Sequence, residues 1–244
     1  MSVKKLALGF VVVFASSAIA ASSAVAAVQT QAAEWYTGAA PGVTLAGDTA
    51  VTAELPREGK FNLAGTAGGS GVEVRATGVE CVGCEITNEE VTEKAGRVAV
   101  ADGQFRFNGV TVVNPPGCVV HTAGVAGNGT ILTKPLKIHA DWMDTNAANQ
   151  HAFLSIFPTT GAVFASLQFT DNPVCPIAGA FNVTGSLFGE AENNTGVQAV
   201  AQPVVFSAAV QTTTGAALKL AGNPATLTGT AIFKNDGLIA FGIH

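Results

Sequence analysis

The sequence AVFASLQFT at residues 162–170 carries the clearest structural signal in the chain. Within it Leu167 and Phe169 alternate with the polar residues Ser166 and Gln168. Side chains of a β-strand point alternately to opposite faces, so a period of two indicates a strand that is buried on one face. We therefore predict a strand here, with Leu167 and Phe169 facing the core.

Comparable short segments, bounded by Gly, Pro, Asn or Asp, recur along the chain. They cover residues 43–55, 60–66, 71–77, 97–101, 104–113, 151–157, 180–188, 197–210, 225–233 and 238–243. Many short strands separated by turn signals are typical of sandwiches and barrels. We expect an all-β fold, either an antiparallel β-sandwich or a barrel-like domain with long loops.

Two local patterns leave more than one interpretation open. NEEVTEK at 88–94 fits a single helical turn capped by Asn88, but also fits a solvated loop. The phrases LAGT (63–66), VTGS (183–186) and LTGT (227–230) fit strands whose glycine lies where another segment crosses closely, although a chain rich in Gly and Thr also produces them by chance. Their unequal spacing excludes a solenoid or propeller.

The first 26 residues have the form of a secretory signal peptide. Lys4 and Lys5 precede an apolar run of about nine residues, too short to span a bilayer, and small residues follow. Cleavage fits after Ala20 or after Ala26, and we favour the latter. We expect residues 27–244 to form one exported all-β domain without a transmembrane segment; a division into two lobes would fall near 141–150 (DWMDTNAANQ), the least strand-like stretch.

Composition narrows the classes of partner. The signal peptide contains two of the 12 Lys and Arg residues and none of the 17 Asp and Glu residues, so its removal changes the net charge from −5 to −7. The remaining basic residues are scattered, which makes nucleic acid an unsuitable partner. Charged residues make up only 12% of the chain, so we expect a surface of small neutral side chains.

Four cysteines, an even number, fit two disulfides in an oxidising compartment: Cys81, Cys84, Cys118 and Cys175. Three pairings are compatible with the sequence, and we favour Cys81 with Cys84 and Cys118 with Cys175. Gly83 can take the positive φ of a type II turn, which brings the ends of Cys81-Val82-Gly83-Cys84 close together.

Redox and zinc-binding roles for this CxxC motif are the alternatives. A redox dithiol usually has a helix after the motif, and no helical pattern follows Cys84. A structural zinc site would need a second cysteine pair at ligand spacing, whereas Cys118 and Cys175 are single and far apart.

The densest set of candidate ligands or acid–base groups is His139, Asp141, Asp144, Asn146 and His151. His139 and Asp141 would share one face of a strand, the start of a metal or acid–base cluster. The spacing matches neither an EF-hand loop nor HExxH, so we predict no metal, no cofactor and no catalytic residue, and keep His139, Asp141 and Asp144 as weak metal candidates.

Other catalytic motifs are missing or incomplete. Gly68-Gly69-Ser70-Gly71-Val72 lacks the second glycine of GxSxG, and there is no phosphate-binding loop. Glu89, Glu90 and Glu93 fit an exposed acidic loop better than a glycosidase pair. Trp35, Tyr36 and Trp142 would be the side chains available for a sugar-stacking platform.

Several phrases resemble those of exported bacterial β-rich, cysteine-containing proteins of unknown function. They are PGCVV (116–120), ILTKPL (131–136), CPIAG (175–179) and VTGS (183–186). The resemblance covers most of the mature chain. It implies an envelope or extracellular location and a disulfide-containing β fold, and it assigns no catalytic residue.

We therefore expect a non-enzymatic structural or binding protein, secreted or held in the cell envelope, whose partner would be the cell surface. Two alternatives stay open: a β-fold module that binds a small apolar ligand or a glycan, and a secreted hydrolase with a site near residues 139–151.

Overall fold

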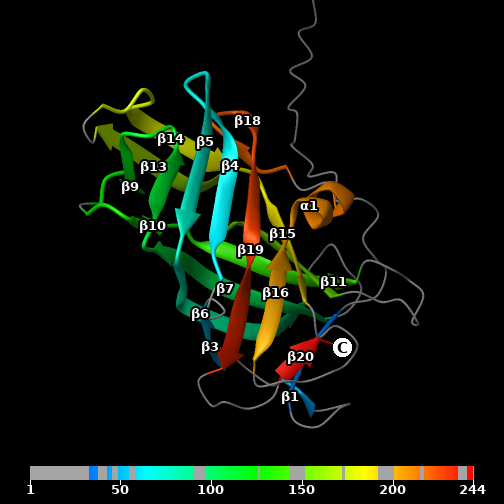
Figure 1. Ribbon diagram of the computed structural model, residues 1–244. Helices are drawn as coiled ribbons and strands as arrows, with labels where there is room; N and C mark the ends of the chain where they lie inside the picture. The colour runs from blue at the N-terminus through cyan, green and yellow to red at the C-terminus, as the bar shows by residue number, and fades with distance from the viewer. Residues whose placement is uncertain are drawn as a thin grey trace, which may run out of the picture.

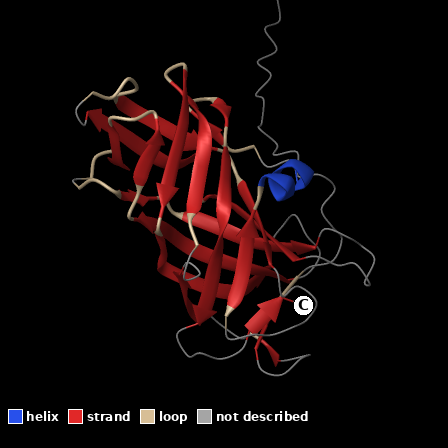
Figure 2. Ribbon diagram, in the orientation of Figure 1, coloured by secondary structure: helices blue, strands red, loops and turns tan. Residues whose placement is uncertain are grey.

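The computed structural model describes residues 33–37, 43–45, 49–54, 59–90, 97–125, 127–142, 152–171, 174–191, 201–214, 217–235 and 241–243. The signal peptide predicted at 1–26 and both of its cleavage sites lie outside these residues. The described chain is almost entirely β-structure, in agreement with the all-β expectation, and one short helix lies at its side (Figure 2).

The largest sheet is antiparallel and strongly curled (Figure 1). Eight of its described strands follow one another round a ring, in the order in which they occur in the chain. They are β3 (Thr49–Glu54), β6 (Gly78–Glu90), β7 (Arg97–Asn108), β11 (Leu136–Trp142), β12 (Ala152–Pro158), β15 (Leu187–Ala191), β16 (Gln202–Phe206) and β19 (Thr226–Asn235).

The last ring strand brings the two sides of the curled sheet together. Within β19, Ile232 pairs with Pro203 of β16 on one side and with Glu54 of β3 on the other. The path of paired strands is thereby continuous round the ring, and both edges of each ring strand find a partner over part of their length. We call these eight strands the ring.

In the part of the chain that the structure describes, four connections between consecutive ring strands contain further helices or strands, and we call them excursions. These excursions contain β4 (Phe61–Ala67) and β5 (Ser70–Ala76); β8 (Thr111–Asn114), β9 (Cys118–Thr122) and β10 (Thr130–Leu132); β13 (Val163–Asp171) and β14 (Gly179–Thr184); and α1 (Ala208–Thr214), β17 (Lys219–Leu220) and β18 (Asn223–Pro224). Because ring neighbours are antiparallel and every second connection carries an excursion, all four leave from the same end.

The strands of the excursions form a second layered structure, which we call the upper lobe from its place in Figure 1. Strands β4, β5 and β8 continue the large sheet beyond β19, and a separate five-stranded sheet runs in the order β18-β17-β14-β13-β9. β19 belongs to both parts, because Thr226 to Thr228 pair with β4 while Gly229 to Phe233 pair with β16.

A small sheet lies at the opposite end of the ring (Figure 1). It consists of β2 (Val43–Thr44), β1 (Trp35–Thr37) and β20 (Phe241–Ile243) in that order. Trp35 pairs with Ile243, so segments from both ends of the described chain meet here.

The ring and the upper lobe share one continuous apolar core. A separate small cluster lies outside the ring, where Phe153 of β12 and Phe188 of β15 pack with Val210 of α1. The helix begins after Ser207, whose Oγ accepts a hydrogen bond from the backbone N–H of Val210 at 3.1 Å. The helix therefore covers apolar side chains on the outer face of the ring.

The strand predicted at 162–170 is confirmed as β13, and its core face is the predicted one. Leu167 is 2% exposed and Phe169 is fully buried. The LAGT, VTGS and LTGT glycines do lie at close crossings: a Cβ at Gly65 would approach Ala225, one at Gly185 would collide with the carbonyl of Ala217, and one at Gly229 would collide with Phe61.

Several predicted boundaries are wrong. Asp102-Gly103 does not end a strand, because β7 continues through it opposite a bulge in β6. The segment 180–188 is two strands in different sheets, which separate at Gly185, where φ is +100°. The segment 197–210 contains β16 and the start of α1, so its last residues are helical.

The longest described strand, β6, was not predicted, and at its start the segment 88–94 is neither the helical turn nor the solvated loop that its pattern fits. Residues 88–90 continue β6, where Asn88 is 4% exposed and bonds to β1; residues 91–96 lie outside the described part. Long-range pairing with β7 outweighs the local capping pattern.

β11 and β12 flank the stretch 143–151 and pair from Leu136–Pro158 to Trp142–Ala152, so the sheet is continuous on both sides of it.

Candidate functional site

The interior of the ring is filled by alternate side chains of its strands and leaves small apolar cavities, of which one measures about 10 Å³ and another about 30 Å³. The side chains around the larger of these two are Trp35, Cys81, Cys84, Ile86, Ala101, Ile138, Leu154, Ala191, Gln202, Val204, Phe233 and Ile243. Eight-stranded barrels either fill with side chains or hold one small ligand. Ligand pockets usually measure about 300–1000 Å³, so this ring belongs to the filled kind.

The end of the cavity near β1 is closed by Trp35. The indole Nε1 donates a hydrogen bond to the carbonyl of Val100 at 3.1 Å. The Asn88 side chain accepts from Trp35 N at 2.7 Å and donates to the carbonyl oxygens of Trp35 at 3.0 Å and Leu45 at 3.3 Å. One buried amide therefore holds β1 and Leu45 against the ring.

The structure pairs Cys81 with Cys84, as predicted, at a bulge in β6. Val82 pairs with Gln104 and Glu85 with Asp102, so Gly83 and Cys84 together face Gly103 of β7. Gly83 has a φ of +60°, which is the conformation expected of it. The two cysteines span the bulge, with their Cα atoms 5.5 Å apart.

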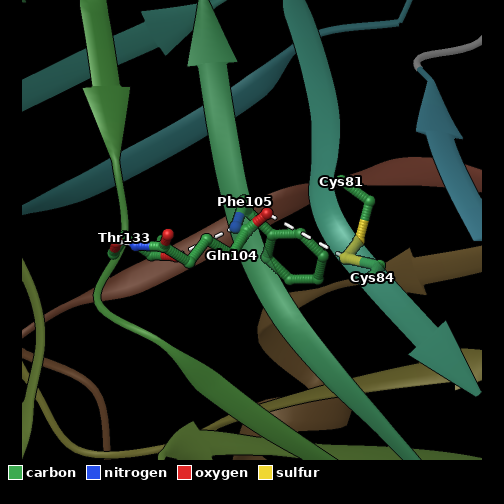
Figure 3. Close-up of a disulfide and its surroundings, with 5 residues drawn as sticks. All are labelled: Cys81, Cys84, Gln104, Phe105 and Thr133. Atoms are coloured by element: carbon green, nitrogen blue, oxygen red, sulfur yellow. Dashed lines mark hydrogen bonds between the residues drawn. A yellow bond between two sulfur atoms is a disulfide. The ribbon is translucent and has the colours of Figure 1, made fainter.

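Gly103 makes room for this disulfide. Its φ is +152°, and a Cβ at this position would lie 2.3 Å from Cys84 Sγ and 2.9 Å from Cys84 Cα. Cys84 Sγ also lies 4.0 Å from the carbonyl oxygen of Gln104 (Figure 3). The sulfur thus packs directly against the backbone of the neighbouring strand.

The part of β7 next to the disulfide is held by Thr133, which is 2% exposed. Its Oγ1 accepts from Phe105 N at 2.9 Å, its N–H donates to the carbonyl of Phe105 at 2.9 Å, and its carbonyl accepts from Gln104 Nε2 at 2.7 Å (Figure 3). These bonds leave the polar groups of a buried residue paired and fix the strand that faces the disulfide.

The second disulfide joins Cys118 and Cys175, again as predicted, and belongs to the upper lobe. Cys118 begins β9, and the Cα atoms of the pair are 4.6 Å apart. By chain entropy, closing a loop with a sequence separation of 57 stabilises by about 4 kcal/mol, against about 2 kcal/mol for the CxxC loop. The upper lobe depends more on its bridge than the ring does.

A second cavity, of about 50 Å³, lies in the upper lobe between its two layers. Its lining is apolar except for Thr133 and includes Leu63 and Val74 on one side and Leu167 and Val183 on the other. The Thr133 hydrogen bonds described above use its hydroxyl within the protein, so the cavity presents an apolar wall.

The structure describes one side chain of the predicted 139–151 cluster, that of His139. The ring of His139 lies on Phe157 at 4.9 Å, edge to face, and its carbonyl accepts from Ser155 Oγ at 3.3 Å. Asp141 lies two residues further along β11, and its side chain is outside the described part. Asp144, Asn146 and His151 also lie outside it.

The other candidate groups have structural surroundings. Ser70 follows the turn between β4 and β5, so it does not stand at a strand-to-helix elbow. Trp35 and Trp142 are 5% and 4% exposed, which places both indoles in the core rather than on a surface platform. Glu89 bonds to Lys137 at 2.9 Å, while the Glu90 side chain and Glu93 lie outside the described part.

Lys137 of β11 and Glu89 of β6 form an ion pair on the ring surface, with the Nζ and Oε2 atoms 2.9 Å apart. The hydrogen bond to Glu89 raises the pKa of Lys137 above its ordinary 10.5, partial burial opposes this, and the charge of Asp102 adds to the increase. Within the described residues, no group of three or more His, Cys, Asp or Glu side chains is placed to hold a metal ion.

Sequence reasoning predicted the disulfides but not the closure of the ring by Trp35 or the bulge. The sequence does contain a signal for the bulge. The apolar residues of this strand stand at odd-numbered positions at first, Val79 and Cys81, and then at even-numbered positions, Cys84 and Ile86. A change of parity inside one strand is what an inserted residue produces. The contact between Asn88 and Trp35 joins residues 53 positions apart and leaves no local pattern.

Comparisons with known proteins add no functional assignment. In the part of the chain that the structure describes, no helix has the length and apolarity that a membrane crossing requires. No protein-family model, curated protein or solved structure matches this chain.

Proposed function

We propose that this protein is exported and has a structural or binding role at the cell surface or in the extracellular space, without catalytic activity. The observation that carries the proposal is the filled ring, whose interior cavity of about 30 Å³ is far smaller than a usual ligand chamber of about 300 Å³ or more. A ring of strands whose interior is filled with side chains would bind a partner at its outer surface and not in its interior.

Two further features support an extracytoplasmic location. The first 26 residues have the pattern of a signal peptide, and the two disulfides suit an oxidising compartment. The low charge of 12% suits a protein that presents small neutral side chains to its surroundings.

Export is tested by expressing the full chain in a bacterial host and sequencing the N-terminus of the protein in each cell fraction. We expect a mature extracytoplasmic form that begins after Ala20 or Ala26, with all four cysteines oxidised. A protein that keeps its first 26 residues in the cytosol and has free thiols would contradict the proposal.

The absence of catalysis is tested with the mature protein and a panel of ester, peptide and glycoside substrates. We expect turnover no higher than that of a heat-unfolded sample. A hydrolytic activity that disappears in His139→Ala, while the variant keeps the far-UV circular dichroism of the parent, would replace the proposal by the hydrolase alternative.

A second candidate function is the binding of a small apolar ligand in the upper lobe. The observation that favours it is the apolar lining of the cavity between the two layers; because its volume of about 50 Å³ is also far below the about 300 Å³ of a usual ligand pocket, binding would require the layers to move apart. Native mass spectrometry of the purified protein would show a bound molecule that is lost in Val183→Phe, which fills the cavity, and retained in Val113→Phe, a variant of an exposed valine. Unliganded protein in both cases would remove this candidate.

A further inference from the structure

The cavity of the upper lobe is enclosed by side chains of the core. All of the residues that line it are buried except Leu63, which is partly buried and packs against the core. They come from both layers, with Val74 of β5 in one layer and Leu167 of β13 and Val183 of β14 in the other. The volume of about 50 Å³ is therefore space inside the lobe and not a groove on its surface.

A bulge in β13 accounts for this space. The register between β13 and β14 shifts between Val163 and Ala165, and the consecutive residues Phe164 and Ala165 are both buried and both line the cavity. Ala165 contributes only a methyl group at this point, where most other lining residues have larger side chains. The two layers therefore pack incompletely around Ala165.

The cavity has room for water but offers water too few partners. A buried water takes about 10–15 Å³ of such a volume and makes about two to four hydrogen bonds. Among the described residues that line the cavity, only Thr133 has a polar side chain. Its Oγ1 already accepts from Phe105 N, and its carbonyl accepts from Gln104 Nε2. A water molecule would find one partner at most, the hydroxyl proton of Thr133, so we expect the cavity to be dry.

A dry cavity of this size suits a very small apolar occupant. Side chains that face empty space lack contact atoms on that side, and an occupant restores these dispersion contacts. A dry cavity of about 150 Å³ lined by Leu, Ile and Phe binds benzene or xenon. The cavity of the upper lobe has about one third of that volume, which is too small for an aromatic ring.

From these observations we infer that the upper lobe contains a binding site for one small apolar molecule, of the size of a xenon atom or of dioxygen. Dispersion contacts with both layers hold the molecule, and the layers keep their positions. The 30 Å³ cavity of the ring is a poorer site, because it is smaller and the amide side chain of Gln202 forms part of its wall. The site does not depend on the surface role proposed above, and it differs from the second candidate function, whose ligand requires the layers to move apart.

Xenon is the probe for this site, because it is apolar and consists of single atoms. The test records methyl NMR spectra of the mature protein at increasing xenon pressure, with equal hydrostatic pressure as the control. We expect saturable shifts at the methyl groups of Leu167 and Val183, and no comparable shift at the exposed Val113 and Val125. Shifts that do not saturate, or shifts that are larger at Ile138 of the ring cavity, would overturn the inference.

The same spectra report on water in the cavity. Without xenon we expect no nuclear Overhauser effect from water to the methyl groups of Leu167 or Val183, because the cavity is dry. Such an effect would show that water already fills the site, and it would contradict the inference as well.

Two alanine-to-valine variants form a matched pair. Ala165→Val extends its side chain into the cavity and should weaken xenon binding by about tenfold or more, because the added methyl groups take up the space. Ala180→Val makes the same change at an exposed position of β14 and should bind xenon like the parent. If Ala165→Val does not fold, Val183→Ile, which adds one methyl group to the wall, takes its place. Unchanged binding in a folded cavity-filling variant would place the xenon elsewhere and overturn the inference.

Benzene separates this site from the second candidate function. We expect no saturable shift at Leu167 or Val183 when benzene is added up to its solubility limit. Saturable binding of benzene at these methyl groups would show that the two layers move apart, which would support the second candidate function and contradict the inferred size limit.

Discussion

Two buried polar residues, Asn88 and Thr133, lie where two backbone segments are joined. Asn88 connects β6 with β1 and Leu45, and Thr133 connects the end of β10 with β7. A buried polar group without a partner costs about 1–3 kcal/mol, so the hydrogen bonds of Asn88 and Thr133 offset the cost of burying them. Each of them also selects one arrangement of the segments that it joins.

Replacing Asn88 by alanine should loosen the closed end of the ring. The variant loses the bonds to Trp35 N, Trp35 O and Leu45 O, and we expect a destabilisation of about 2–4 kcal/mol. Urea unfolding measures the change, and amide exchange at Trp35 should accelerate. Asn223→Ala serves as the control: the residue is exposed and its Nδ2 makes only long bonds, to Thr66 O at 3.3 Å and Ala221 O at 3.4 Å, so the variant should stay within about 0.5 kcal/mol of the parent. Equal effects in the two variants would contradict this role of Asn88.

Gly103 is a second residue whose identity the tertiary structure requires. Gly103→Ala places a Cβ 2.3 Å from Cys84 Sγ and in a backbone conformation that favours glycine, so we expect a loss of about 2–4 kcal/mol. Gly83→Ala shares the positive φ but meets no atom within 4 Å, and it should lose only about 1 kcal/mol. The difference between their urea midpoints isolates the close approach. Similar midpoints would show that the disulfide moves aside without cost.

At the scale of elements, side-chain pairs connect strands that are not hydrogen-bonded to each other. β6 and β11 both flank β7, and the Lys137–Glu89 bond passes across the strand between them. On the other side of the ring, α1 adds Gln211, whose Nε2 donates to the carbonyl of Leu227 in β19. These side-chain hydrogen bonds stabilise the curled shape of the large sheet.

The Lys137–Glu89 pair should make stability depend on pH in the alkaline range. Because folding raises the pKa of Lys137 above 10.5, its contribution is complete below that pH and is lost as the pH rises through the folded-state value. The pair is partly exposed, with 29% and 38% of its side chains accessible, so we expect only about 0.2–1 kcal/mol.

Urea midpoints of the parent and of Lys137→Met at pH 8 and pH 11 check this expectation. The advantage of the parent at pH 8 should shrink at pH 11. Lys134→Met, at an exposed lysine, provides the control and should change little at either pH. An advantage of the parent that is constant or larger at pH 11 would assign the effect to packing of the lysine stem.

At the scale of the whole molecule, the ring and the upper lobe are interwoven. Every excursion begins and ends in the ring, and β19 runs through both parts as a single strand. One continuous core joins them. Neither the ring nor the upper lobe is formed by one continuous chain segment that could fold independently of the other.

We therefore expect the protein to unfold in one cooperative transition. Tryptophan fluorescence reports on the ring, because Trp35 and Trp142 are buried there, and far-UV circular dichroism reports on all strands. The two urea transitions should coincide. Cys118→Ser with Cys175→Ser, which weakens the upper lobe by about 4 kcal/mol, should shift both curves together. Separate transitions would show two independent folding units.

Local sequence patterns predicted individual elements well where one face of a strand is buried. AVFASLQFT specified β13 and its core face, and the CxxC spacing with Gly83 specified the local disulfide. They failed where a distant partner decides the conformation. Asn88 looked like a helix cap but is a strand residue bonded to Trp35, and Asp102-Gly103 looked like a turn but faces a bulge.

The sequence by itself determined the all-β class and the burial of alternate strand residues, because each depends on neighbours within a few positions. It favoured one of three possible pairings of the four cysteines, and the structure confirmed that pairing. Only the tertiary structure decided that β19 joins β16 to β3, that Trp35 closes the ring and that Gly83 and Cys84 form a bulge opposite Gly103. Alternation specifies which face of a strand is buried but not which strand lies beside it, since backbone hydrogen bonds between strands are the same for every pair of side chains.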